Sequence, residues 1–281
     1  MAKILIGGAG GAPSNNFIWS LRESSRTDHL IGTSCEPSDL FLADVDEKFV
    51  IPPAKSAEWK PVFLRLLHRT KPDFVHVQND FEVRALSRIR SELDQLGIRY
   101  FLPDSDAVEN CVDKGASYQI WKKSGVAVPH TVIIRNEEDL KSALEMFGGK
   151  MWIRATEGGG GKGALPVDNF DFARIWINHY DGWGRFTAAE LLSSDTATWM
   201  SIWHEGELIV AQGRRRLSWN FGNRTLSGVT GITGVGETID DPKVDQLAMD
   251  AIHAVSPKPH GIFAVDMTYD FGGNPRVTEI N

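Results

Sequence analysis

Two acidic residues and an amide near the end of the chain have the spacing of a cation site. The last 19 residues, FAVDMTYDFGGNPRVTEIN, have the pattern of two alternating strands joined by a glycine pair, which favours a hairpin. If Gly272 and Gly273 are the two turn residues, Asp266 faces Glu279, and Asn281 shares a strand face with Glu279. A cation would relieve the repulsion between the opposed carboxylates, and oxygen ligands suit Mg²⁺ or Mn²⁺. A solvated hairpin face remains open, and a one-residue slip in register would separate the pair.

A run of four glycines precedes a lysine in TEGGGGKGA, residues 156–164. Glycines let backbone N–H groups approach an anion, and the lysine adds a positive charge, so phosphate binding is one interpretation. A Walker A loop is excluded, because Thr156 and Gly163 stand where that motif needs a glycine and a Ser or Thr. A protein-kinase loop would open its domain, whereas this segment lies mid-chain. The pattern predicts a flexible flap after a strand at 151–154, and a loop with no ligand remains the alternative.

An arginine-rich strand could bind an anion. The segment QGRRRLSWNFGNRTLSG contains Arg214, Arg215, Arg216 and Arg224. On a strand Arg214 and Arg216 share one face and Arg215 points to the other. We expect Arg216 and Arg224 to hold a carboxylate or a phosphate, because the guanidinium fork matches such groups. An exposed basic strand that pairs with nearby acids explains the segment equally well.

Alternation of strands and helices organises the first hundred residues. Helices are expected at 14–24, with Ser14 as N-cap, at 57–72 and at 81–97. Apolar strands are expected at 3–8, 29–36, 73–78 and 98–103. This order predicts a parallel sheet covered on both faces, in a Rossmann-like α/β domain over residues 1–105.

The pattern changes after Pro103. Residues 106–187 are expected to form a small α+β unit that contains the glycine loop. Residues 188–281 are expected to form a larger α+β unit, mostly strands, with one helix at 241–255.

Composition excludes several classes of protein. The chain of 281 residues is 42% hydrophobic and 24% charged, which is ordinary for a globular protein. A net charge of −7 disfavours a nucleic-acid surface, and no apolar run reaches the roughly 18–20 residues of a membrane span. The N-terminus lacks a signal-peptide pattern, and the two cysteines have no metal-binding spacing. We expect a cytoplasmic protein with small-molecule substrates, and a homodimer is the oligomer left open.

Taken together, these motifs resemble the ATP-grasp superfamily, in its carbamoyl-phosphate-synthase-like, carboxylate–amine ligase type. Asp266, Glu279 and Asn281 match the D…E-x-N metal set, and TEGGGGKGA matches the loop that closes over phosphates. DKGASYQIWKKSGVAVP resembles the family's DK…GIPVP segment, and AELL resembles the hinge between its two subdomains. The opening ILIGGAGGAPSNN resembles the domain that precedes the ATP-grasp fold, so the resemblance covers essentially the whole chain.

The resemblance implies ATP and Mg²⁺ (or Mn²⁺) as cofactors and a role for each matched residue. Phosphate contacts would come from Lys114, Arg154, Gly159, Gly160, Gly161, Lys162 and Gly163. Glu190, Leu191 and Leu192 would meet adenine, chiefly through their backbone, and Asp195 is the available residue for the ribose. Arg216 and Arg224 would bind the acid substrate or the γ-phosphate. ATP would phosphorylate a carboxylate, and an amine or similar nucleophile would displace the phosphate from the acyl phosphate.

The chain departs from the family pattern in three places. Asp195 is a weak match to the usual ribose residue, and the loop has more glycine than its relatives. The chain stops at Asn281, where the family continues, so we expect the third unit to be C-terminally incomplete. Two alternatives stay open: a non-catalytic ATP-binding sensor, and an NAD(P)-dependent oxidoreductase. The second is disfavoured because Pro13 replaces the third glycine of the dinucleotide fingerprint.

Overall fold

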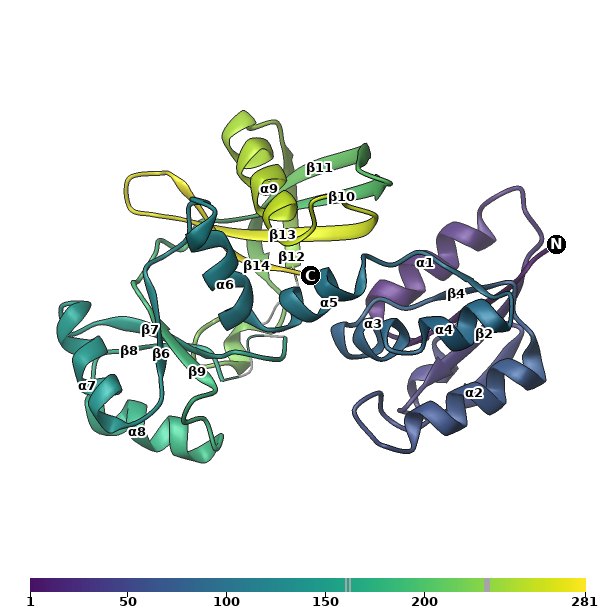
Figure 1. The fold of residues 1–281 in the computed structure, drawn as a ribbon, viewed down its shortest axis with the longest axis horizontal. Helices are drawn as coiled ribbons and strands as arrows, with labels where there is room; N and C mark the ends of the chain where they lie inside the picture. Colours follow the sequence, from purple (N-terminus) through teal and green to yellow (C-terminus); the bar gives the residue numbers. More distant parts are fainter. Residues whose placement is uncertain (160, 162, 230–232) are drawn as a thin grey trace. The chain divides into compact units, whose positions relative to one another are not determined.

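The computed structural model describes residues 1–159, 161, 163–229 and 233–281. It divides into two compact units, Met1–Val108 and Glu109–Asn281 (Figure 1). Among the described helices, none combines the length and apolar character that crossing a bilayer requires.

Unit 1 is a five-stranded parallel sheet with strand order β3-β2-β1-β4-β5. Its strands are β1 Lys3–Ile6, β2 His29–Ser34, β3 Glu47–Val50, β4 Phe74–His76 and β5 Arg99–Tyr100. Its helices are α1 Ala12–Arg22, η1 Asp39–Phe41, α2 Trp59–Thr70, α3 Asp80–Ser87, α4 Arg90–Gln95 and α5 Ser105–Val112, the last of which continues into unit 2.

Both faces of this sheet are covered, because successive strand residues point to opposite sides. Leu5 packs with the core that includes α2, α3 and α4, whereas Ile4 and Ile6 pack with Ile18 of α1. Two details differ from the sequence prediction. The expected helix at 81–97 is divided between α3 and α4, and the N-cap of α1 is Gly11, since the Ser14 hydroxyl instead donates to the Gly7 carbonyl at 2.7 Å.

Unit 2 contains two further sheets. The four-stranded sheet, in the order β6-β9-β7-β8, comprises β6 Thr131–Ile134, β7 Met151–Ala155, β8 Leu165–Val167 and β9 Phe186–Ala189. The helices α7 Glu137–Met146 and α8 Phe170–His179 pack against it and share its core (Figure 1).

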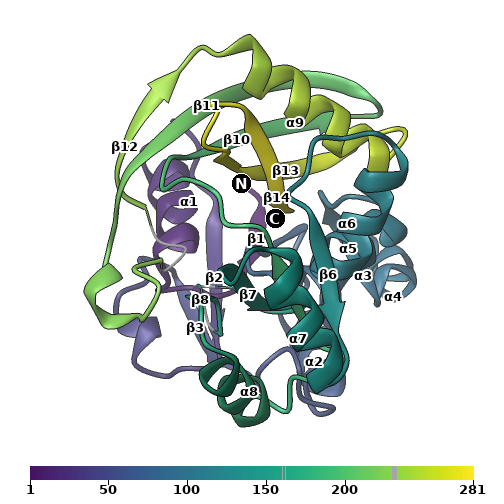
Figure 2. The same cartoon turned by 90° about the vertical axis from the view of Figure 1, so that its left-hand side faces the viewer.

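The larger sheet is antiparallel, with strand order β12-β11-β10-β13-β14. It comprises β10 Thr196–His204, β11 Glu207–Trp219, β12 Thr233–Ile239, β13 Gly261–Tyr269 and β14 Pro275–Ile280, with the short helix η2 Gly222–Arg224 after β11. The helices α6 Lys114–Lys123 and α9 Pro242–Val255 pack together over one face of it (Figure 2). Trp199, Phe263 and Val265 point into that core. The alternate residues of the same strands therefore point to the opposite face.

Candidate active site

The predicted pair of acidic residues is paired in the large sheet. Asp266 of β13 lies opposite Glu279 of β14. The turn differs from the prediction: Tyr269 pairs with Pro275, and the Asp270 N–H donates to the Asn274 carbonyl at 2.9 Å, so three residues (271–273) rather than two form the turn. A bulge at Thr278 adds one residue to β14 and restores the predicted pairing.

The bulge also separates the core from the site along β14. Val277 is buried in the core with α9, whereas Glu279, two residues later, contacts the cationic side chains described below. In a regular strand these two residues would share a face. The Thr278 carbonyl accepts a hydrogen bond from Arg154 Nη2 at 2.6 Å, and its hydroxyl donates to the Asp266 carbonyl at 3.0 Å.

Two cationic side chains meet Glu279. Lys114, the first residue of α6, places its Nζ 3.3 Å from Glu279 Oε2, and Arg154 of β7 places Nη1 3.6 Å from the same oxygen. Burial alone would raise the pKa of Glu279, but Lys114 and Arg154 hold that pKa below its usual range. Burial lowers the pKa of the Arg154 guanidinium, although the neighbouring carboxylates oppose this effect.

Asp266 has a different environment. Arg216 Nη2 of β11 lies 2.6 Å from Asp266 Oδ1, and Asn281 Nδ2 lies 3.4 Å from Oδ2. Burial raises the pKa of Asp266, and Glu279 adds to this effect, while Arg216 opposes it. In this part of the structure three cationic side chains thus face two carboxylates, which leaves a net positive charge that suits a polyanion.

The glycine loop is attached to the same cluster. Lys114 Nζ donates to the Gly158 carbonyl at 2.7 Å, and the backbone N–H of Lys114 donates to the Thr156 carbonyl at 2.9 Å. At its other end, Trp176 Nε1 of α8 donates to the Gly163 carbonyl at 3.0 Å. Gly160 and Lys162, which were predicted to bind phosphate, lie outside the described residues.

A cavity of about 700 Å³ connects these groups. Of the predicted site residues, those that line it are Lys114, Arg154, Gly159, Gly161, Glu190, Leu191, Leu192, Asp195, Arg216, Asp266 and Glu279. Gly163 and Asn281 are not among its lining residues; Gly163 is bound by Trp176 of α8, and Asn281 contacts Asp266.

The structure places Arg216 in the cavity wall and Arg224 outside it. Arg224 is not among the lining residues of the cavity; it belongs to η2, where its guanidinium lies 5.0 Å from the ring centre of Phe221. The physical reason is that the chain leaves β11 through Phe221 in a left-handed conformation, with φ 59°, and turns into η2. Arg215 alternates with Arg214 and Arg216 along β11 and pairs with the fully buried Ala197, as expected for the opposite face of the strand, although it also borders the cavity.

Sequence reasoning also missed the apolar wall of the cavity. Trp152 and Ala189, which pair across β7 and β9, line it next to the segment that contains Leu191 and Leu192. Trp152 stands two residues before Arg154 on β7, so the period of a strand could have found it. The Glu190 carboxylate accepts a hydrogen bond from the His130 N–H at 2.8 Å, and the Glu190 N–H donates to the His130 carbonyl at 3.0 Å, so Glu190 is bound to the residue that precedes β6.

The residues fit a hard divalent cation. Two carboxylates and one amide oxygen form an oxygen-only donor set of the kind that Mg²⁺ prefers, with positions left for water and phosphate. Within the described residues, no group of three or more His, Cys, Asp and Glu side chains could hold a metal ion. A cation here would therefore depend on the amide of Asn281 and on a ligand.

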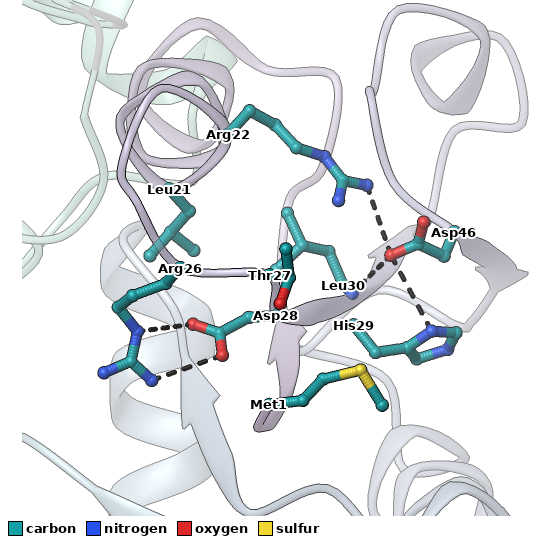
Figure 3. Close-up of a pocket in the computed structure, with 9 residues that line it drawn as sticks. All are labelled: Met1, Leu21, Arg22, Arg26, Thr27, Asp28, His29, Leu30 and Asp46. Atoms are coloured by element: carbon teal, nitrogen blue, oxygen red, sulfur yellow. Dashed lines mark hydrogen bonds and ion pairs between the residues drawn. The ribbon is translucent and has the colours of Figure 1, made fainter.

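A smaller hollow of about 320 Å³ lies in unit 1 (Figure 3). It is lined by Met1, Leu21, Arg22, Arg26, Thr27, Asp28, His29, Leu30 and Asp46. Arg26 pairs with Asp28 at 2.7 Å, and Arg22 pairs with Asp46 at 3.2 Å. These charged side chains thus pair with one another. The hollow also lies at the amino ends of β1 and β2, whereas ligands of open α/β sheets bind at the carboxyl ends. Both observations disfavour it as a ligand site.

Comparison with known proteins agrees with this geometry. No protein-family model matches the chain. Over 119 residues, 42% of the chain, it is 27% identical to a probable alpha-L-glutamate ligase of Legionella pneumophila, and the match spans 39% of that protein's length.

Solved structures match over the whole chain. The biotin carboxylase domain of Hydrogenobacter thermophilus 2-oxoglutarate carboxylase, a dimer crystallised with MgADP, ADP and bicarbonate, gives a TM-score of 0.74 at 15% identity, covering 100% of this chain and 63% of that one. The L-amino acid ligase of Bacillus licheniformis gives 0.73 at 12% identity, covering 100% and 66%. The chain has the ATP-grasp fold.

The ATP-grasp likeness concerns the fold, because the identities to the solved structures are low. Neither the oxidoreductase nor the sensor alternative gains support from these proteins. A function for this chain therefore has to be inferred from the geometry of its site.

Proposed function

We propose that this ATP-grasp protein is an ATP-dependent, ADP-forming ligase. It activates a carboxylate as an acyl phosphate, which an amine or a similar nucleophile then attacks. The observation that carries the proposal is one cavity in which a glycine loop, three cationic side chains and two paired carboxylates meet. The relatives named above support it, because one is called a glutamate ligase and another an L-amino acid ligase.

The phosphates of ATP would lie where Glu279 holds Lys114 and Arg154. In the proposed complex these two cations release Glu279 and contact phosphate oxygens, and Gly159 and Gly161 offer backbone N–H groups from above. Gly160, Lys162 and Gly163 would complete the loop. Asp266, Glu279 and Asn281 would hold Mg²⁺ (or Mn²⁺), which supplies charge neutralisation and orientation of the transferred phosphoryl group.

The base and ribose would occupy the apolar end of the cavity. Trp152 and Ala189 give apolar contact, and the backbone of 190–192 offers hydrogen bonds at the edge of adenine. Asp195, also at the cavity wall, would accept a hydrogen bond from a ribose hydroxyl.

Arg216 would bind the acid substrate. Its Nη2 pairs with Asp266, but its buried Nε has no hydrogen-bond partner in the described structure. An unsatisfied buried donor costs stability, and a substrate carboxylate would satisfy it in a two-point contact. The loop would exclude water from the acyl phosphate, which water would otherwise hydrolyse.

Residues 106–187 and 188–281 would be the two ATP-grasp subdomains, and residues 1–105 the Rossmann-like domain that precedes them. The parallel topology of unit 1 supports the latter. One dimeric structural neighbour is the support for a homodimer, and a cytoplasmic location remains part of the proposal.

The test is Mg²⁺-dependent phosphate release with ATP over a panel of amino acids and dicarboxylates plus an amine donor. The Glu279→Gln variant lacks the negative charge of Glu279, and its turnover should be roughly 100-fold lower or more. Its circular dichroism spectrum should be unchanged. Glu237→Gln, on the exposed strand β12, is the matched control and should retain wild-type turnover. Unchanged turnover in the Glu279 variant would refute the assignment of the site.

A further inference from the structure

Thr198 lies beside Asp266 in the middle of the large sheet. The two residues face each other across β10 and β13, and the Thr198 hydroxyl donates to Asp266 Oδ1 at 2.8 Å. Thr198 is 2% exposed. Met200 and Ile202, which follow it on the same face of β10, are 38% and 37% exposed. This face of β10 is therefore not buried along its whole length, and Thr198 is buried where the strand passes the charged residues of the site.

The two oxygens of Asp266 are used unequally. Oδ1 accepts both the Thr198 hydroxyl at 2.8 Å and Arg216 Nη2 at 2.6 Å. For Oδ2 the described structure gives a single long contact, 3.4 Å to Asn281 Nδ2. Oδ2 is therefore the oxygen with lone pairs left for a cation, and the bonds to Oδ1 fix its direction.

Arg216 cannot fix that direction alone throughout the reaction. If Arg216 turns toward the carboxylate of the acid, its bond to Asp266 weakens at the moment when the carboxylate orientation matters. Thr198 can keep its hydrogen bond to Asp266 when substrate binds, because it is buried and its β-branched side chain is restricted in rotation.

We propose that Thr198 is a positioning residue, which holds Asp266 with Oδ2 directed at the cation. The inference rests on the proposed function. The competing explanation is that a buried hydroxyl has merely found an acceptor, with no effect on cation binding.

The experiment measures Mn²⁺ binding to the full chain by electron paramagnetic resonance, with a non-hydrolysable ATP analogue present. Thr198→Val keeps the shape and removes the hydroxyl, and it should weaken Mn²⁺ binding by roughly 10- to 100-fold. Thr198→Ser restores the hydroxyl and should come within roughly threefold of wild type. Ser201→Ala, which removes a buried hydroxyl from the core face of the same strand, should bind Mn²⁺ as wild type does.

The outcomes separate the two proposals. If Thr198→Val binds Mn²⁺ within twofold of wild type, the positioning role is overturned and the ligase proposal stays intact. Equal losses in Thr198→Val and Thr198→Ser overturn it as well, because the hydroxyl would then not be the cause. A wild-type protein that binds no Mn²⁺ with the analogue overturns the metal site itself, and with it the proposed function.

Discussion

Two glycine-rich segments of the chain look alike in sequence and differ in what surrounds them. After β1, the segment GGAGG spans residues 7–11, and the second segment spans 158–163. A Cβ on Gly10 would lie 1.9 Å from the Asp39 carbonyl oxygen, and one on Gly7 would lie 2.6 Å from Glu82 Oε2. A Cβ on Gly158 would meet no atom of the described structure within 4 Å.

The difference shows that glycine serves two purposes here. In unit 1 the protein's own backbone and the Glu82 carboxylate occupy the space that the missing side chains leave, so glycine permits close packing. In unit 2 the space above Gly158, Gly159 and Gly161 belongs to the large cavity, so glycine leaves room for a ligand. Glycine count alone cannot distinguish the two cases.

The largest effect is expected from Gly10→Ala. The added methyl group would overlap a backbone oxygen, and Gly10 has a φ of 98°, which strains any other residue. We expect a loss of roughly 4 kcal/mol or more in the free energy of unfolding, measured by urea denaturation. A loss below about 1 kcal/mol would mean that Gly10 is not packed closely against the Asp39 backbone.

Glu82 gives the second effect, through its pH dependence. Burial raises the pKa of Glu82 to about 7 from an ordinary value of 4.5, against hydrogen bonds from Asn79 and from the backbone of Gly8. The folded state therefore binds this proton more strongly than the unfolded state, and stability is lost as the pH rises from about 4.5 to 7. Glu82→Gln removes this titration.

The stability of Glu82→Gln relative to wild type should thus increase by roughly 3 kcal/mol across that window. The measurement is urea unfolding of both proteins from pH 4.5 to 8. The comparison is made as a difference because His76, whose pKa burial lowers to about 4, changes stability in the opposite direction in both proteins. A difference that stays constant with pH would show that the Glu82 carboxyl, which α3 packs against the glycine turn, is not desolvated there.

The smallest effect on stability is expected from Gly158→Ala. The new methyl group has space, and the φ of 103° costs about 1 kcal/mol. Because the loop would be held in a different conformation above the phosphates, KM for ATP should rise roughly 10-fold while unfolding changes little. The steady-state assay is the phosphate-release assay described above. A variant with wild-type KM but a large loss of stability would show that Gly158 serves packing, as Gly10 does, rather than ligand binding.

Sequence reasoning was most successful where a residue's neighbours lie on adjacent strands. The Asp266–Glu279 pairing was predicted, but the turn was wrong by one residue and the bulge at Thr278 compensated for that error. A bulge depends on tertiary contacts, here the bond from Arg154 to the Thr278 carbonyl, and leaves no local signal. The parallel sheet of unit 1 followed from its strand–helix alternation, although β3 was missed because Glu47 and Lys48 make it look polar.

Arg224 and Thr198 mark what the sequence could not reveal. Arg224 was expected to bind an anion together with Arg216, but the left-handed residue Phe221 turns the chain from β11 into η2. Thr198 resembles any threonine of an alternating strand. Its importance comes from a partner 68 positions away, which no local pattern contains.

The extra residue at Thr278 also matters for comparing this chain with others position by position. Val277 belongs to the helix-covered face and Glu279 to the other, so their separation of two depends on that single insertion. In a homologue with a straight final strand, the equivalent carboxylate would stand directly after the core residue. An alignment that forbids a gap at this point would then match the acid to the wrong column, and a functional homologue would be scored as inactive.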